Sequence, residues 1–156
     1  MSDDILVSRL EGNKLVVEAG DEITEYDSKF LIAAVLVYVA RGNGQIEPEE
    51  SARMIDLIED HFKMQGAETL ELLTRAISEL DEEPELVPLL CGLGPTLSDA
   101  DKEDLALMGL KVVAADGKRH VAEMEQFSRA MEAIGVSPEI VHRAFDRYFA
   151  ETMPGL

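Results

Sequence analysis

Two stretches of the sequence decide the fold: residues 33–50 read AAVLVYVARGNGQIEPEE, and residues 107–123 read LMGLKVVAADGKRHVAE. Each has an apolar segment, a corner containing Asn-Gly or Asp-Gly, and then an acid early in the next segment. Aligning the corners pairs Asn43 with Asp116, Gly44 with Gly117 and Glu50 with Glu123. An apolar helix cannot cover itself, so we expect two helical hairpins packed about a pseudo-two-fold axis, with residues 30–40 and 105–115 central.

The rest of the sequence predicts an all-α fold with about seven helices. Residues that favour helix starts, such as Asp27, Ser98 and Ser137, precede segments whose apolar residues recur at helical spacing. Gly66 and Gly135 follow such segments and indicate helix ends. We expect helices near residues 28–41, 47–66, 70–80, 84–92, 98–115, 121–135 and 137–149.

The domain organisation predicted from the sequence has two parts. Residues 1–25 are expected to form an N-terminal arm or a short β-hairpin, and residues 26–156 a helical domain. Two apolar triplets, at 5–7 and 15–17, flank Glu11-Gly12-Asn13-Lys14, which is typical of a hairpin. An irregular or partly helical arm is the alternative.

Composition restricts the function. The chain of 156 residues has 14 Lys+Arg against 32 Asp+Glu, a formal net charge of −18. Such a surface repels phosphate, so we expect no nucleic-acid partner, and cations or a basic protein surface are favoured instead. The longest apolar run, residues 30–40, is about half of the roughly 20 residues that a membrane span needs. With an acidic N-terminus and the single cysteine Cys91, these features predict a cytoplasmic protein without membrane insertion.

The repeated corner resembles the TerB-like family of tellurite-resistance proteins, whose motif has the loose form A-x-D-G-x-[apolar]-x-x-x-E. The motif occurs twice at matched spacing, and the resemblance spans about residues 28–150. It implies a binding module linked to tellurite resistance or stress response, with a divalent cation held by acids of the motif. Two positions depart from the pattern: Asn43 replaces the usual Asp, and Arg119 replaces an apolar residue.

If the hairpins meet near their axis, the corners form an oxygen-rich cluster that suits Ca²⁺, Mg²⁺ or Mn²⁺, and its histidine admits Zn²⁺ or Mn²⁺. The candidate metal ligands are Asn43, Glu47, Glu50, Asp116, His120 and Glu123. The corners are not EF-hands, since the first two ligand positions of such loops would fall on Val39 and Arg41, and on Val112 and Ala114. The alternative is that the acids only stabilise helix N-termini.

The sequence predicts a non-enzymatic protein. It contains no P-loop, no G-x-S-x-G and no H-E-x-x-H, and its three histidines share no metal-like spacing. Two alternatives stay open: a structural adaptor that binds a protein partner without metal, and a metal-dependent hydrolase with His120 as general base. Cys91 is expected to be a packed, inert thiol. Lys111 interrupts an apolar helix and is expected either to reach solvent or to pair with an acid.

Overall fold

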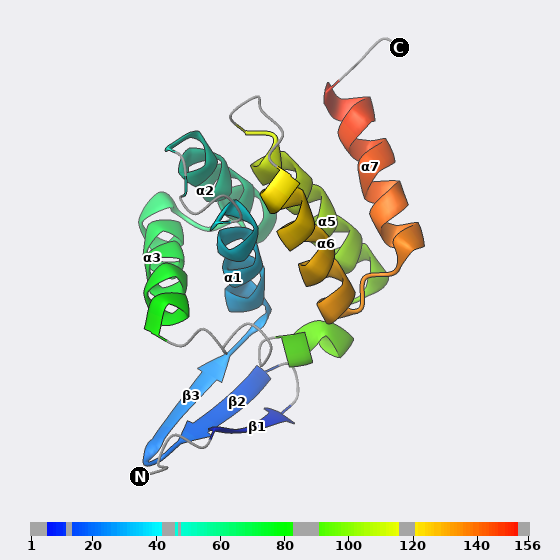
Figure 1. Cartoon of the computed structure of the whole chain (residues 1–156). Coiled ribbons are helices and arrows are strands. Elements are labelled where there is room, and N and C mark those ends of the chain that lie inside the picture. The colour runs from blue at the N-terminus through cyan, green and yellow to red at the C-terminus, as the bar shows by residue number, and fades with distance from the viewer. Residues whose placement is uncertain are drawn as a thin grey trace.

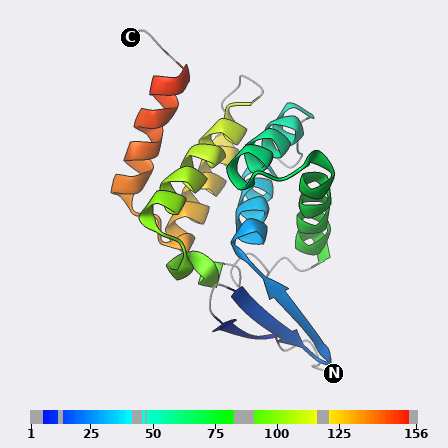
Figure 2. The same ribbon diagram turned by 180° about the vertical axis from the view of Figure 1, so that it is seen from behind.

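The computed structural model describes residues 6–11, 14–41, 46, 48–82, 91–115 and 121–152. The elements form a layer of helices with a small sheet beneath one end (Figures 1 and 2). Their order is β1 (Leu6–Glu11), β2 (Lys14–Ala19), β3 (Glu22–Tyr26), α1 (Ser28–Ala40), α2 (Pro48–Phe62), α3 (Gly66–Glu82), the 3₁₀ helix η2 (Cys91–Thr96), α5 (Asp99–Val113), α6 (Val121–Ile134) and α7 (Pro138–Thr152). The predicted, mainly helical fold is confirmed. The helix expected near residues 84–92 lies mostly outside the described ranges.

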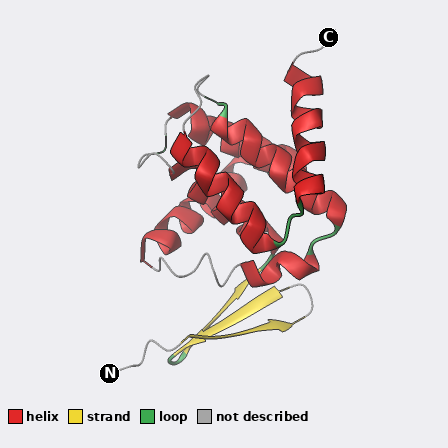
Figure 3. Ribbon diagram, turned by 45° about the vertical axis from the view of Figure 1, so that its right-hand side comes forward, coloured by secondary structure: helices red, strands yellow, loops and turns green. Residues whose placement is uncertain are grey.

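The N-terminal strands form a three-stranded antiparallel sheet in the order β1-β2-β3 (Figure 3). The predicted hairpin is confirmed: Glu11 pairs with Lys14 and Leu10 with Leu15 across β1 and β2. The sequence did not predict the third strand, β3. Its residues EITEY lack a clear apolar alternation, and only Tyr26 is buried. Pairing with β2, rather than local pattern, therefore defines this strand.

Aromatic packing joins the sheet to the helices. The Tyr26 and Phe30 ring centroids lie 4.7 Å apart, across the junction of β3 and α1. The Tyr26 hydroxyl donates a hydrogen bond of 2.6 Å to Glu79 of α3. The Arg75 guanidinium, also from α3, lies 4.5 Å from the Phe30 ring centroid, a cation–π arrangement. Because Leu15 and Val17 of β2 belong to the same core cluster as the helices, the sheet and helices share one core.

Helices α1 and α5 occupy the centre of the core, as predicted from their apolar sequences. Every residue of α1 from Phe30 to Val37 is buried, and so is every residue of α5 from Leu105 to Leu110. Helix α1 contacts α5 and is covered by α2, α3 and α6. A helix that is apolar on all sides is stable in water only in such a position. The two apolar segments therefore set the architecture, and the amphipathic helices cover them.

Side-chain caps begin three of the helices where the sequence predicts. Each capping oxygen accepts a hydrogen bond from the backbone N–H three residues later, which satisfies one free donor of the first turn. The pairs are Asp27 with Phe30 at 3.1 Å, Ser98 with Asp101 at 3.1 Å and Ser137 with Ile140 at 3.3 Å. Helix α6 ends at Ile134, and the next residue, Gly135, has a φ of 90°, which suits a residue without Cβ.

The expected end of α2 at Gly66 is wrong. Helix α2 stops at Phe62, and Gly66 is the first residue of α3. Lys63 takes the left-handed conformation after α2, with φ of 55°, which glycine usually adopts at a helix end. A lysine does not indicate this conformation in a sequence. The predicted end of α2 therefore falls on the next glycine, Gly66.

Ion pairs attach the last helix to the centre of the protein. Helix α7 packs against α5, and Lys111 donates a hydrogen bond of 2.7 Å to Glu151. Of the two expectations for Lys111, pairing with an acid is therefore the one observed. The Lys111 ammonium lowers the pKa of Glu151; partial burial opposes this shift, and the charges of Arg147 and Arg53 add to it.

The lowered pKa predicts how this contact depends on pH. A carboxyl whose pKa is lower in the folded than in the unfolded state stabilises the protein above its ordinary pKa, 4.5, and loses that effect as the pH falls through the folded value. We expect Glu151→Gln to lower the free energy of unfolding by about 0.5 kcal/mol at pH 7, since the pair is partly exposed, and to lower it by less at pH 3. Urea unfolding at both pH values measures this. Glu71→Gln, at an exposed position of α3, is the control that should lose no stability at either pH.

Candidate functional site

Glu50 lies in the first turn of α2, two residues after Pro48 opens the helix. Its side chain is completely buried, with a relative exposure of 0%. The neighbouring Glu49 is exposed, as an acid at a helix N-terminus usually is. An exposed carboxylate stabilises a helix N-terminus equally well. The burial of Glu50 therefore requires a further explanation.

Glu123 occupies the corresponding place in the second hairpin. It lies in the first turn of α6, and its relative exposure is also 0%. Both of its carboxylate oxygens are buried, as is Oε2 of Glu50. Glu50, Glu123 and Thr69 are the buried polar residues of the described chain, and the first two are those that the sequence alignment pairs.

The topology places the two glutamates on the same side of the protein. Helix α1 leaves β3, and α5 follows η2, which contacts β2, so both central helices run away from the sheet. Helices α2 and α6 therefore both begin on the side of the helical layer away from the sheet (Figure 1). The two glutamates therefore share one side of the helical layer, and the corners themselves lie outside the described residues.

The burial of two carboxylates sets an electrostatic requirement. An ionised carboxylate removed from water is costly unless hydrogen bonds or a positive charge compensate it. Each helix N-terminus supplies the equivalent of about half a positive charge, and each glutamate has an interaction partner in the structure. A bound divalent cation is a further source of compensation, and buried carboxylate oxygens are the ligands that Ca²⁺, Mg²⁺ and Mn²⁺ prefer.

Of the six predicted metal ligands, the structure describes two, Glu50 and Glu123. The other four, Asn43, Glu47, Asp116 and His120, lie outside the described residues. The same holds for Arg119, and for the side chain of Cys91.

Sequence reasoning missed a cluster of three side chains of types that can bind a metal ion. His61, Asp101 and Asp104 each offer a ligand atom, and these atoms lie within 4.8 Å of one another. His61 is far from the aspartates in sequence and belongs to no metal-like motif, so no sequence signal pointed to this group. Contact between α2 and α5 brings the residues together.

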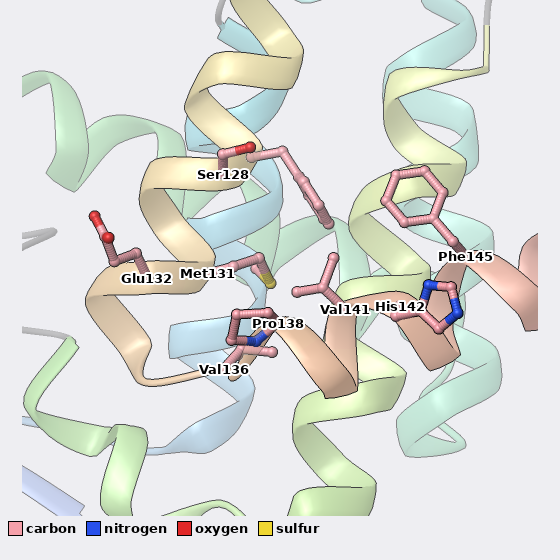
Figure 4. Close-up of a pocket in the computed structure, with 9 residues that line it drawn as sticks. Ser128, Met131, Glu132, Val136, Pro138, Val141, His142 and Phe145 are labelled. Atoms are coloured by element: carbon pink, nitrogen blue, oxygen red, sulfur yellow. The ribbon is translucent and has the colours of Figure 1, made fainter.

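A groove of about 410 Å³ separates the C-terminal part of α6 from the start of α7. Its floor is apolar, and Met131 and Val141 point toward one another across it (Figure 4). Glu132 points away from the groove, and His142 lies on the α7 side. The ionisable residues that line the groove, Glu132 and His142, lie on different helices, and their side chains do not point toward one another.

These features define a class of protein: an acidic helical protein with two apolar central helices and a buried glutamate at the start of each following helix. The chain belongs to the TerB family, because the family model described as tellurite resistance protein TerB matches residues 29–146. The resemblance seen in the sequence is confirmed, and tellurite resistance is the functional context that the family provides. Searches of curated proteins and of solved structures found no match. No helix in the described part of the chain has both the length and the apolar character that crossing a bilayer requires.

Proposed function

We propose that this TerB-family chain is a non-enzymatic binding module that takes up a divalent cation between the starts of α2 and α6, with Glu50 and Glu123 as ligands. The observation that carries the proposal is the complete burial of both carboxylates at positions paired by the sequence alignment. Within the family's tellurite-resistance context, such a site would serve recognition or a stress response rather than turnover.

The preferred cations follow from the ligand chemistry. Two carboxylates with further oxygen ligands suit Ca²⁺, Mg²⁺ or Mn²⁺, and Zn²⁺ becomes competitive only where a nitrogen ligand joins. Asn43, Glu47 and Asp116 would supply more oxygen, and His120 would supply the nitrogen. The net charge of −18 favours any cation by long-range attraction, so the site must be identified by variants rather than by affinity alone.

The test is a thermal-unfolding titration of the full chain with Ca²⁺, Mg²⁺, Mn²⁺ and Zn²⁺ after chelator treatment. At a cation concentration of about 100 times Kd, binding should add about 2.7 kcal/mol, which raises Tm by roughly 5–10 °C. Glu50→Gln/Glu123→Gln should abolish that increase. Glu49→Gln/Glu125→Gln is the matched control: it removes the same charge from exposed positions of the same two helices and should keep the increase.

The same variants distinguish the proposed metal site from the alternative function. In that alternative the protein is an adaptor, and its buried glutamates only stabilise the fold. That alternative is favoured by the interaction partners that both glutamates already have. It predicts that Glu50→Gln/Glu123→Gln loses about 1–3 kcal/mol of stability in chelator and that no cation stabilises the parent protein. An equal cation effect in the parent and the double variant would overturn the proposed metal site.

A further inference from the structure

We propose that His61, Asp101 and Asp104 form a second, separate site for a divalent transition metal, represented by Zn²⁺. The site joins the last turn of α2 to the first turns of α5 and involves no residue of the glutamate pair. Its three ligand atoms lie within 4.8 Å of one another, and His61 Nδ1 is 3.9 Å from Asp104 Oδ2.

The distances suit a metal after a small contraction. Zn²⁺ binds imidazole nitrogen and carboxylate oxygen at about 2.0–2.2 Å, so two ligand atoms of a tetrahedral site lie about 3.4 Å apart. The separation of 3.9 Å between His61 Nδ1 and Asp104 Oδ2 exceeds this spacing by about 0.5 Å. All three ligand atoms already lie within 4.8 Å of one another, on helices that are in contact, so side-chain rotation can supply the remaining contraction.

The donor set selects the class of metal. One imidazole and two carboxylates give three protein ligands, which leaves a position for water in tetrahedral Zn²⁺. Imidazole also suits Co²⁺ and Mn²⁺, whereas Ca²⁺ and Mg²⁺ prefer oxygen ligands throughout. The histidine therefore distinguishes this group from the acids that commonly line helix N-termini.

Neighbouring contacts orient two of the ligands. Arg147 donates a hydrogen bond of 2.9 Å to Oδ1 of Asp104, while Oδ2 is the oxygen nearest His61. Glu103 accepts a hydrogen bond of 3.0 Å from the same guanidinium and balances its charge. The Phe62 ring packs edge-on against the His61 imidazole at a centroid distance of 4.6 Å. Hydrogen bonds to a ligating carboxylate hold it in one orientation, which is the role that Arg147 would have at Asp104.

The site is independent of the proposed glutamate site. Glu50 and His61 lie at opposite ends of α2, about 16 Å apart along the helix axis at 1.5 Å per residue. The alignment of the two hairpins places the buried apolar residues Ile134 and Leu31 at the positions of His61 and Asp104. Since neither Ile134 nor Leu31 can bind a metal, the repeat provides no second copy of the site. The group of His61, Asp101 and Asp104 is therefore not part of the duplicated hairpin pattern.

The experiment uses the full-length Glu50→Gln/Glu123→Gln variant, so that failure of the glutamate proposal does not affect the result. Zn²⁺ binding by calorimetry should show one site, and Co²⁺ substitution should give the visible absorption bands of a low-symmetry complex. Adding His61→Gln or Asp101→Asn should weaken Zn²⁺ binding at least tenfold. His142→Gln is the matched control, since His142 is an exposed histidine 3.7 Å from Asp146 with no third ligand given by the described residues.

Three results would overturn the proposal. The first is no Zn²⁺ binding in this background, and the second is an affinity that His61→Gln and Asp101→Asn leave within twofold of the parent. Both substitutions are polar and close in size to the original residues, and circular dichroism checks that each variant is folded. Weakening by His142→Gln equal to that by His61→Gln would also contradict it, because it would show dispersed surface binding.

Discussion

Replacing Gly94 with alanine is expected to destabilise the protein by about 3 kcal/mol, the upper part of the range for overpacked sites. Gly94 is buried in η2, and a Cβ there would lie 2.2 Å from the backbone oxygen of Ile134 and 3.1 Å from its carbonyl carbon. A backbone carbonyl cannot rotate away as a side chain can. Relief therefore requires η2 to separate from the end of α6, where Gly135 holds a left-handed conformation.

Urea unfolding of Gly94→Ala and Gly92→Ala measures this effect against a control in the same 3₁₀ helix. A Cβ on Gly92 would have Leu15 Cδ1 as its nearest neighbour, at 3.9 Å, which is an ordinary contact. Gly92→Ala should therefore change the free energy of unfolding by no more than about 0.5 kcal/mol. Equal effects of the two substitutions would contradict the close approach of η2 and α6.

Truncating Phe127 is expected to have the other large effect, a loss of about 3–5 kcal/mol. Phe127 is almost fully buried in α6, and a Cβ on Gly109 of α5 would lie 2.9 Å from its ring. Gly109→Ala alone should therefore cost about 1–3 kcal/mol, because the buried ring must move. In the Phe127→Ala background the same change should be neutral or stabilising by up to about 1 kcal/mol, since alanine favours helix and partly fills the space.

A double-mutant cycle with Gly109→Ala and Phe127→Ala measures this coupling. We expect an interaction energy of at least about 1 kcal/mol, and additivity within about 0.5 kcal/mol would show that the two residues are independent. The aligned positions in the first hairpin hold Leu36 and Met54, both buried. Both residues are large there, whereas the second hairpin pairs a glycine on the central helix with a phenylalanine on the covering helix.

Part of the candidate site could be predicted from the sequence. The spacing of Glu50 and Glu123 after their corners marked both residues, and the structure buries both. The group of His61, Asp101 and Asp104 could not be predicted, because its members come from helices that no local pattern relates. Whether ligands from separate helices converge depends on how those helices pack and rotate, which sequence spacing does not specify.

The sequence by itself determined the helical class, the two central helices and most helix starts. These features depend on interactions within a few residues: apolar periodicity, and capping oxygens such as those of Asp27, Ser98 and Ser137. Only the tertiary structure decided that Glu22–Tyr26 pairs as a third strand, that α2 ends at Phe62 before a left-handed Lys63, and that Lys111 pairs with Glu151. Each of these depends on contacts or backbone geometry set by the packing of distant segments, and the local free-energy preferences are too weak to specify them.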